Sequence, residues 1–240
     1  MRRPGAGAPP AGRAHKFPDR PGSLFSGKAA VALRVSISHP ERMDITGPGG
    51  AVTHGADQDW FPDFWQRRAG CGPTAAALIC AYLAQTRPAL APLYPEAVME
   101  RGPFTAHMER VWQFVTPSSH GLHRPEWMAQ GMAAYAASRG AALSPALLDF
   151  PGAATKRPPW EAVEAFVARS LELDCPVAFL NLHNGVVKAL DSWHWVTLTA
   201  LEDGRADLLD SGEKLTVDLR LWYQTTRRRG GFVSALGDGT

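Results

Sequence analysis

The sequence predicts an α+β protein, with a mostly helical first part followed by a mostly antiparallel sheet. Between residues 71 and 167, apolar residues recur at the three- and four-residue spacings of amphipathic helices. After Asp174 the spacing changes, and short apolar or alternating runs follow one another with only brief polar breaks. Helices and strands that are separated along the chain are typical of the α+β class.

The N-terminal residues 1–28 are rich in Pro, Gly, Ala and Arg, and this composition predicts a flexible tail. Residues 29–240 are then expected to form one domain. Within it, the β-branched run at 30–38 predicts a strand, and the Gly-rich stretch at 47–60 predicts a loop.

The helical part begins at Cys71, where an Ala- and Leu-rich run extends to Ala84. Pro73 falls in the first turn, where its missing N–H removes no helical hydrogen bond. Three amphipathic patterns follow. They consist of Met108, Val111, Trp112 and Val115; of Trp127, Met128, Met132 and Tyr135; and of Trp160, Val163, Phe166 and Val167.

The sheet is predicted from five runs near the C-terminal end. The first is apolar throughout, as expected of a buried strand, and the next three read as a meander. The five runs are residues 176–182, 194–201, 205–210, 214–219 and 230–236.

Composition excludes several functions. The chain has 240 residues, 45% of them hydrophobic, which is enough for a buried core. Its net charge of +2 argues against a nucleic-acid partner. It has no run of about 18 apolar residues, so no membrane span is predicted. Its three cysteines form no CxxC pair, which argues against a zinc site or a disulfide framework. We therefore expect no metal or organic cofactor.

The expected location is cytoplasmic, because few and unpaired cysteines suit a reducing compartment. The N-terminal stretch has a basic start but lacks the apolar segment of a signal peptide. A secreted effector remains the alternative, since some secretion routes leave little trace in the sequence.

Cys71 is the candidate nucleophile. It lies between Gly70 and Gly72 at the start of a predicted helix, where the unpaired N–H groups and the helix dipole favour an anion. A thiol attacks as the thiolate, so this setting suits catalysis. The alternative is a small buried cysteine at a tight turn. Cys80 and Cys175 lack this setting and are expected to lie in the core.

A cysteine nucleophile needs a base, and His194 is the best candidate. It enters a predicted strand between Trp193 and Trp195, whose rings would exclude water and fix the imidazole. His183, which ends another strand, is the second choice.

Other histidines fit less well. His107 is predicted to lie off the apolar face of its helix. His120 and His123 form an HxxH pair in a loop, but no carboxylate or thiol cluster accompanies them as metal ligands.

Asp210 is the candidate orienting group, and this depends on a predicted hairpin. If the apolar faces of 194–201 and 205–210 match, even-numbered residues face even-numbered ones, which requires a three-residue turn at 202–204. Residue 196 then lies opposite residue 210, and Asp210 becomes the diagonal neighbour of His194. A strict two-residue Asp-Gly turn would put Asp210 on the other face.

These features resemble the papain-like cysteine peptidase superfamily, in which a Gln precedes a Cys helix and a late strand brings a His and then an Asp. The stretches "QRRAGCGPTAAALICAYL", "HWVTLTAL" and "LLDSGEKLTVDL" look most like the bacterial double-glycine-type (bacteriocin-processing-like) peptidase domains. Phytochelatin synthases share the same residue order. The likeness runs over about residues 60–236, but residues 87–175 match nothing specific.

The resemblance implies a papain-like fold, with an N-terminal helical half packed on a C-terminal antiparallel sheet. It implies that Cys71 is the nucleophile, His194 the general acid and base, and Asp210 the residue that orients the imidazole. Gln66 would donate its amide to the oxyanion. In several relatives an aromatic or acidic residue stands where this chain has Gly70, which is expected to leave a roomier substrate entry.

Trp193 and Trp195 have two interpretations, namely packing against the helical part or lining the substrate cleft. Trp193 is the better candidate for the cleft because it directly precedes the base.

The expected activity is a cysteine-dependent hydrolase acting on a peptide or isopeptide amide of a peptide or protein substrate through an acyl-enzyme. One alternative is an acyltransferase of the same fold, like the phytochelatin synthases. Another is a non-catalytic papain-like binding module.

Overall fold

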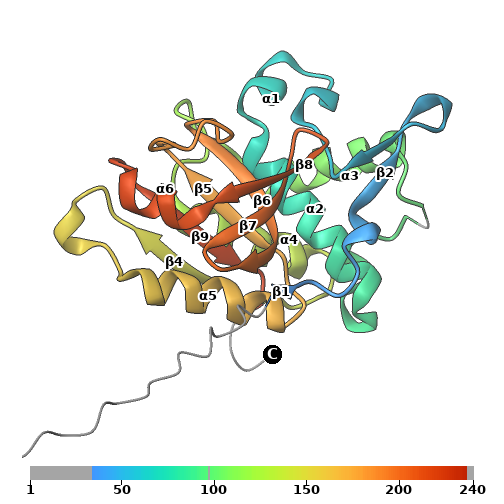
Figure 1. Ribbon diagram of the computed structural model, residues 1–240. Coiled ribbons are helices and arrows are strands. Elements are labelled where there is room, and N and C mark those ends of the chain that lie inside the picture. The colour runs from blue at the N-terminus through green and yellow to red at the C-terminus, as the bar shows by residue number, and fades with distance from the viewer. Residues whose placement is uncertain (1–33, 97, 237–240) are drawn as a thin grey trace, which may run out of the picture. The chain divides into compact units, whose positions relative to one another are not determined.

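The computed structural model describes residues 34–96 and 98–236 and shows a mixed α+β architecture (Figure 1). The predicted tail, residues 1–28, lies outside the described residues, as do residues 29–33 and 237–240 of the predicted domain. Apart from Ala200, the apolar side chains buried in the described part belong to one cluster, which is shared by helices and sheet.

An antiparallel sheet of seven strands is the centre of the described structure. Its strands run in the spatial order β4-β9-β5-β6-β7-β8, and β1 pairs with β6 outside this path. A separate hairpin joins β2 to β3. The bounds are β1 Val35–Ser36, β2 Asp44–Thr46, β3 Val52–His54, β4 Ala146–Phe150, β5 Val177–Asn181, β6 His194–Glu202, β7 Arg205–Asp210, β8 Glu213–Asp218 and β9 Gly230–Ser234.

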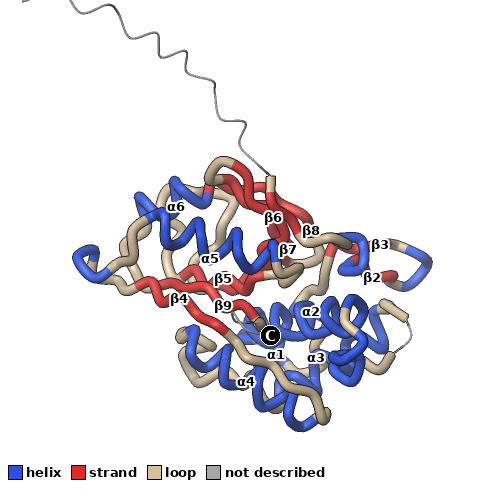
Figure 2. The backbone as a smooth tube through the Cα atoms, turned by 90° about the horizontal axis from the view of Figure 1, so that it is seen from below, coloured by secondary structure: helices blue, strands red, loops and turns tan. Residues whose placement is uncertain are grey.

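Helices cover both faces of this sheet (Figure 2). On one face α2 packs on β5 and β6, and α4 packs on β4 and β9; α1 and α3 lie on the same side. On the other face α5 packs on β1, β5 and β6, and α6 packs on β7. The bounds are α1 Phe64–Ala69, α2 Cys71–Thr86, α3 Arg101–Trp112, α4 Pro125–Ser138, α5 Trp160–Glu172 and α6 Leu219–Thr225.

Helix α2 is buried on all sides, which explains its composition. Every residue from Gly72 to Leu83 is buried. A helix between a sheet and other helices has no solvent face, so its small and apolar residues need not be restricted to one stripe. Pro73 lies in its first turn, as predicted. The N-terminus of α2 is thereby held at a fixed place against β6.

The predicted mixture of helices and antiparallel strands is confirmed, and so are the four predicted helices and the five predicted C-terminal strands. The separation into two parts is incomplete, because β1 and β4 come from the predicted helical part or before it, and α6 comes from the predicted sheet part. The prediction of a loop across residues 47–60 is wrong at β3, which pairs with β2. The sequence reading also missed α1, β2, β4 and α6.

His107 lies inside the core, so its predicted place off the apolar face of α3 is wrong. Its side chain is 0% exposed, with Nε2 3.0 Å from the Ala77 carbonyl oxygen of α2 and Nδ1 3.3 Å from the Tyr135 hydroxyl of α4. The rings of Tyr94 and Phe104 pack edge-on against it. His107 therefore joins three helices, and its buried, apolar surroundings favour the neutral imidazole.

Acid is expected to destabilise the protein through His107. Burial lowers the pKa of this imidazole from 6.5 to about 3, and the nearby charges of Arg110 and Arg139 act in the same direction. Below pH 6.5 the unfolded chain binds a proton here that the folded chain does not, so stability falls with pH by up to about 1.4 kcal/mol per unit until pH 3. Urea unfolding of wild type and His107→Gln at several pH values would test this. An equally steep pH dependence in the variant would contradict it.

Candidate active site around Cys71

Cys71 is the first residue of α2, and its side chain is partly exposed. Gly70 separates it from the end of α1. Gly72 follows, and a Cβ at that position would lie 2.6 Å from Leu122 and 3.3 Å from Trp195. The absence of a side chain at Gly72 thus lets α2 approach β6 closely, which brings Cys71 beside the start of that strand.

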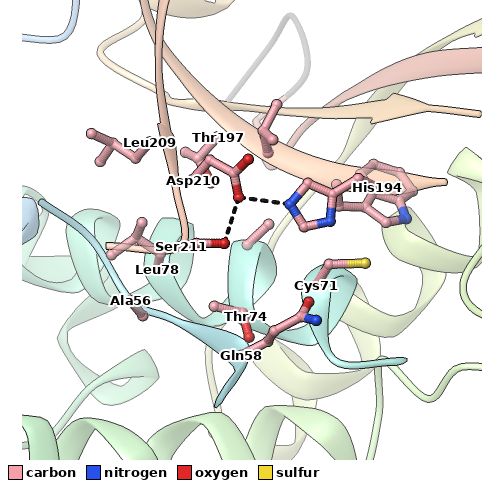
Figure 3. Close-up of a pocket in the computed structure, with 13 residues that line it drawn as sticks. Ala56, Gln58, Cys71, Thr74, Leu78, His194, Thr197, Leu209, Asp210 and Ser211 are labelled. Atoms are coloured by element: carbon pink, nitrogen blue, oxygen red, sulfur yellow. Dashed lines mark hydrogen bonds and ion pairs between the residues drawn. The ribbon is translucent and has the colours of Figure 1, made fainter. Parts of the chain in front are cut away.

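His194 begins β6 and lies between Cys71 and Asp210 (Figure 3). Its Nε2 is 2.6 Å from Oδ1 of Asp210, and both side chains are largely buried. Asp210 also accepts a hydrogen bond of 3.0 Å from the Ser211 hydroxyl. Because Asp210 occupies Nε2, the remaining ring nitrogen, Nδ1, is left for the side of Cys71. The structure therefore brings these three predicted residues together.

The turn between β6 and β7 differs from the predicted one. Glu202 pairs with Arg205, so the turn has the two residues Asp203 and Gly204 rather than three. Both have positive φ, +47° and +74°, which is the backbone of the tight turns that Asp-Gly favours in hairpins. With no other irregularity, this turn would place Asp210 on the opposite face from His194.

A β-bulge restores the register that the site needs. The pairing shifts between Leu198 and Ala200, so Thr199 is the extra residue of β6. Beyond the bulge, Leu198 lies opposite Leu208 and Thr197 opposite Leu209. The predicted alignment near His194 is thus correct, but it results from a two-residue turn and a bulge instead of a three-residue turn.

The site stabilises a charged imidazole. Burial alone would lower the pKa of His194, but hydrogen bonds and charge from Asp210 and Cys71 outweigh it and raise the pKa from 6.5 to about 10. The Asp210 carboxyl is buried too, which opposes its ionisation. The hydrogen bond and charge of His194, with a smaller effect of Ser211, nevertheless hold its pKa below 3.8. Asp210 and His194 therefore form an ion pair at neutral pH.

This ion pair predicts a window of pH in which it contributes most to stability. The raised pKa of His194 stabilises the fold fully below pH 6.5, and this contribution is lost as the pH rises towards 10. The lowered pKa of Asp210 stabilises the fold above pH 3.8, and this contribution is lost as the pH falls below that value. The melting temperature of Asp210→Ala should therefore differ most from that of wild type between pH 3.8 and 6.5. A difference that grows above pH 7 would contradict the assignment.

Gln58, rather than Gln66, lies at the pocket that contains Cys71 and His194 (Figure 3). Gln66 is in α1 and lines neither pocket beside Cys71. Its backbone N–H donates a hydrogen bond to the side chain of Asp63, which caps that helix. Gln58 Nε2 donates one hydrogen bond of 2.8 Å to the Arg67 carbonyl, which leaves its second hydrogen available. Helix α1 lies between Gln58 and Cys71 along the chain, which explains why spacing along the chain pointed to Gln66 instead.

Two buried polar atoms of this pocket have no hydrogen-bond partner within the described chain. They are Oε1 of Gln58 and Oγ1 of Thr74, which lies one turn along α2 from Cys71. Unpartnered buried polar atoms are costly in a folded protein and are frequent where a site awaits a ligand or water. No pattern in the sequence distinguished Gln58 or Thr74.

Gly70 is a packing position and does not widen the entrance, contrary to the prediction. It is buried and lines neither pocket beside Cys71. A Cβ here would lie 2.3 Å from the Gln66 carbonyl oxygen and 2.7 Å from the Phe61 ring. Glycine is therefore required at residue 70 because the backbone of α1 and a core aromatic ring leave no room.

Cys71 lines two neighbouring pockets of very different size. The one with His194 and Asp210 has a volume of about 20 Å³, which is room for a water molecule. The second has a volume of about 300 Å³ and lies against Leu122, Trp195 and Trp193. Trp195 is a buried wall whose Nε1 donates to the Leu122 carbonyl, whereas Trp193 is 50% exposed. Both tryptophans thus line the pocket beside Cys71.

The other candidate residues, Cys80, Cys175 and His183, lie away from the pocket and contribute to packing or backbone hydrogen bonding. Cys80 and Cys175 are fully buried, and burial raises the pKa of both thiols, that of Cys80 to about 12. His183 Nδ1 accepts hydrogen bonds from two backbone N–H groups, of Gly185 and Arg227.

Among the residues that the structure describes, no three His, Cys, Asp or Glu side chains are grouped to hold a metal ion. The same residues include no helix with the length and apolar character needed to cross a bilayer.

The fold and the site define the class as an α+β protein with a Cys–His–Asp cluster between its buried helix α2 and its antiparallel sheet. The chain matches no protein-family model, and no curated protein is significantly similar to it.

Proposed function

We propose that the protein is a cysteine-dependent hydrolase that cleaves a peptide or isopeptide amide through an acyl-enzyme. The observation that carries this proposal is the position of His194. One imidazole nitrogen is bonded to Asp210 at 2.6 Å, and Cys71 lines the same pocket as the ring. A papain-like fold is part of the same proposal, since helix α2 delivers the thiol and β6 delivers the base.

Acylation would begin with the Cys71 sulfur as a thiolate beside the His194 imidazolium. The sulfur attacks the carbonyl carbon of the amide and a tetrahedral oxyanion forms. The Cys71 backbone N–H at the start of α2 and the free Nε2 hydrogen of Gln58 are the donors that would stabilise this oxyanion. The C–N bond breaks as imidazolium Nδ1 gives its proton to the departing amine nitrogen.

Deacylation would use the same imidazole in its neutral form. Nδ1 takes a proton from a water molecule, whose oxygen attacks the thioester carbon. The C–S bond then breaks, the carboxylic acid leaves, and the imidazolium and thiolate are restored. Asp210 remains ionised throughout and keeps the imidazole in one orientation, which its bond to Nε2 favours.

Selective alkylation tests the nucleophile. Iodoacetamide is added at pH 6, and modification of Cys71, Cys80 and Cys175 is followed by peptide mass spectrometry. Cys71 should react much faster than the other two, which are buried and have raised pKa values. In His194→Gln, the rate at Cys71 at pH 6 should fall because the imidazolium is gone. Equal, slow labelling of all three thiols would favour the non-catalytic binding module.

Substrate turnover tests the reaction. A positional library of tetrapeptidyl aminomethylcoumarins is incubated with wild type and with Cys71→Ala, and the released fluorophore is measured. A parallel incubation contains glycine methyl ester as an amine acceptor, and its products are identified by mass spectrometry. Release of free acid supports hydrolysis, while acyl-glycine ester as the main product would support the acyltransferase alternative. No Cys71-dependent product in either case would contradict both.

A further inference from the structure

The 300 Å³ pocket beside Cys71 has a composition that points to a particular kind of substrate. It is the larger of the two pockets that Cys71 lines, and the other has room only for water-sized groups. A substrate side chain next to the scissile bond can therefore enter only this second pocket.

The deep walls of the pocket are apolar and rigid. Leu122, Leu180, Leu182 and Trp195 are each less than 9% exposed. The hydrogen bond from Trp195 Nε1 to the Leu122 carbonyl ties β6 to the loop at 118–123, which is closed by a bridge between Ser118 and Gly121. Walls of this kind bind an apolar side chain without first having to become ordered.

Trp193 forms the rim of the pocket in a strained conformation. Its φ is +62°, a left-handed value that costs an ordinary residue stability, and the residue is half exposed. The guanidinium of Arg228 lies 5.7 Å from the centre of the ring. Neither the backbone nor burial favours a tryptophan at this position. A role in contacting substrate would explain it.

The described lining of the pocket is polar on one side and carries no acidic group. Arg68, His120 and His123 line it, whereas no Asp or Glu is among its described lining residues. Within residues 34–96 and 98–236, Arg68 shows no ion pair and no hydrogen bond from its guanidinium, so its charge is not neutralised by a neighbour. Arg228 adds a second guanidinium above Trp193. A carboxylate at the rim would be attracted and an ammonium group repelled.

We propose that this pocket selects an acidic–apolar substrate: a bulky apolar or aromatic side chain enters between Trp193 and Leu122, and a neighbouring carboxylate lies against Arg68. The inference rests on the proposed hydrolase, because it assumes that Cys71 attacks the bound chain.

The test uses dipeptidyl acyloxymethyl ketones, in which the thiolate displaces the carboxylate leaving group and forms a C–S bond. The panel is Phe-Glu, Glu-Phe, Phe-Gln, Phe-Lys and Ala-Glu. Rates of modification at Cys71 are measured by mass spectrometry and divided by the iodoacetamide rate of the same protein. This ratio separates recognition by the pocket from reactivity of the thiol.

The faster of the two Phe/Glu orders should exceed Ala-Glu by about 10-fold, as expected for loss of an apolar contact. It should exceed Phe-Gln by about 3-fold and Phe-Lys by about 10-fold, since the ion pair is solvent-exposed. Arg68→Gln should lose only the discrimination of charge. Trp193→Gly, which relieves the positive φ, should lose only the preference for Phe.

Two matched controls remove the same chemical groups elsewhere. Arg205→Gln deletes an exposed arginine, and Phe64→Ala deletes an exposed aromatic ring, and neither residue lines the pocket. Both should keep the wild-type ratios. A panel in which Phe-Lys or Ala-Glu equals the best probe, with normal iodoacetamide labelling of Cys71, overturns the substrate inference alone. Slow iodoacetamide labelling of Cys71 overturns the hydrolase proposal and this inference with it.

Discussion

Replacing Cys71 with alanine, or His194 with glutamine, is expected to lower peptide hydrolysis by more than about 10³-fold. The double variant should be no slower than the worse of the two single variants. In the proposed mechanism the thiolate and the imidazole act as one unit: without the base the sulfur is a poor nucleophile, and without the sulfur the base has no partner. The measurement is kcat/KM on the best substrate from the coumarin library.

His54→Gln is the matched control for the histidine. His54 is exposed and bonded to Asp44 in the β2–β3 hairpin, and it does not line either pocket. Its variant should hydrolyse the same substrate at the wild-type rate. Independent, multiplicative losses for Cys71→Ala and His194→Gln would contradict a shared mechanism, because they would show that each residue acts without the other.

Gly70→Ala is expected to be the most damaging conservative change near the site, destabilising the protein by about 3 kcal/mol. The added methyl group would meet a backbone oxygen at 2.3 Å and the ring of Phe61 at 2.7 Å. A backbone atom cannot move aside as a flexible side chain can, so α1 and the start of α2 must separate. Chemical denaturation would measure the loss, and iodoacetamide labelling would show whether Cys71 loses its reactivity together with the fold.

Gly102→Ala is the matched comparison. Gly102 lies in α3, and a Cβ there meets no atom within 4 Å. Alanine stabilises a helix relative to glycine by up to about 1 kcal/mol, and Gly102 is in the first turn, so this variant should be slightly more stable than wild type. If both glycine variants changed stability equally, the contacts around residue 70 would not be the cause.

The sequence predicted those elements whose residues follow a regular pattern over many positions. Helix α2 and strand β5 were visible as continuous apolar runs, and strands β6 to β9 as short apolar or alternating runs separated by brief polar breaks. Strand β4 and helix α6 are short, and β4 is only partly buried, so no long pattern marks them. Helix α1 did carry a signal, since Asp63 caps it by accepting hydrogen bonds from Trp65 and Gln66.

The part of the site that depends on the pairing of two neighbouring strands could be predicted from the sequence. The part that depends on how distant segments fold back on one another could not. Matching apolar faces was enough to align Asp210 with His194, because burial fixes register more strongly than any one turn does. The bulge at Thr199 left no trace in the residues, so the turn was misassigned. Gln58 was missed because a helix separates it from Cys71, and distance in sequence then says little about distance in space.

The position of strand β9 in the sheet limits the order in which the strands can pair during synthesis. Along the chain it follows every other described strand, yet in space it lies between β4 and β5. During synthesis, β5 to β8 can pair as soon as they leave the ribosome, while β4 has no neighbour until residues 230–234 emerge. A growing chain would expose the edges of both β4 and β5 in this interval, when chaperones or premature self-association compete for them.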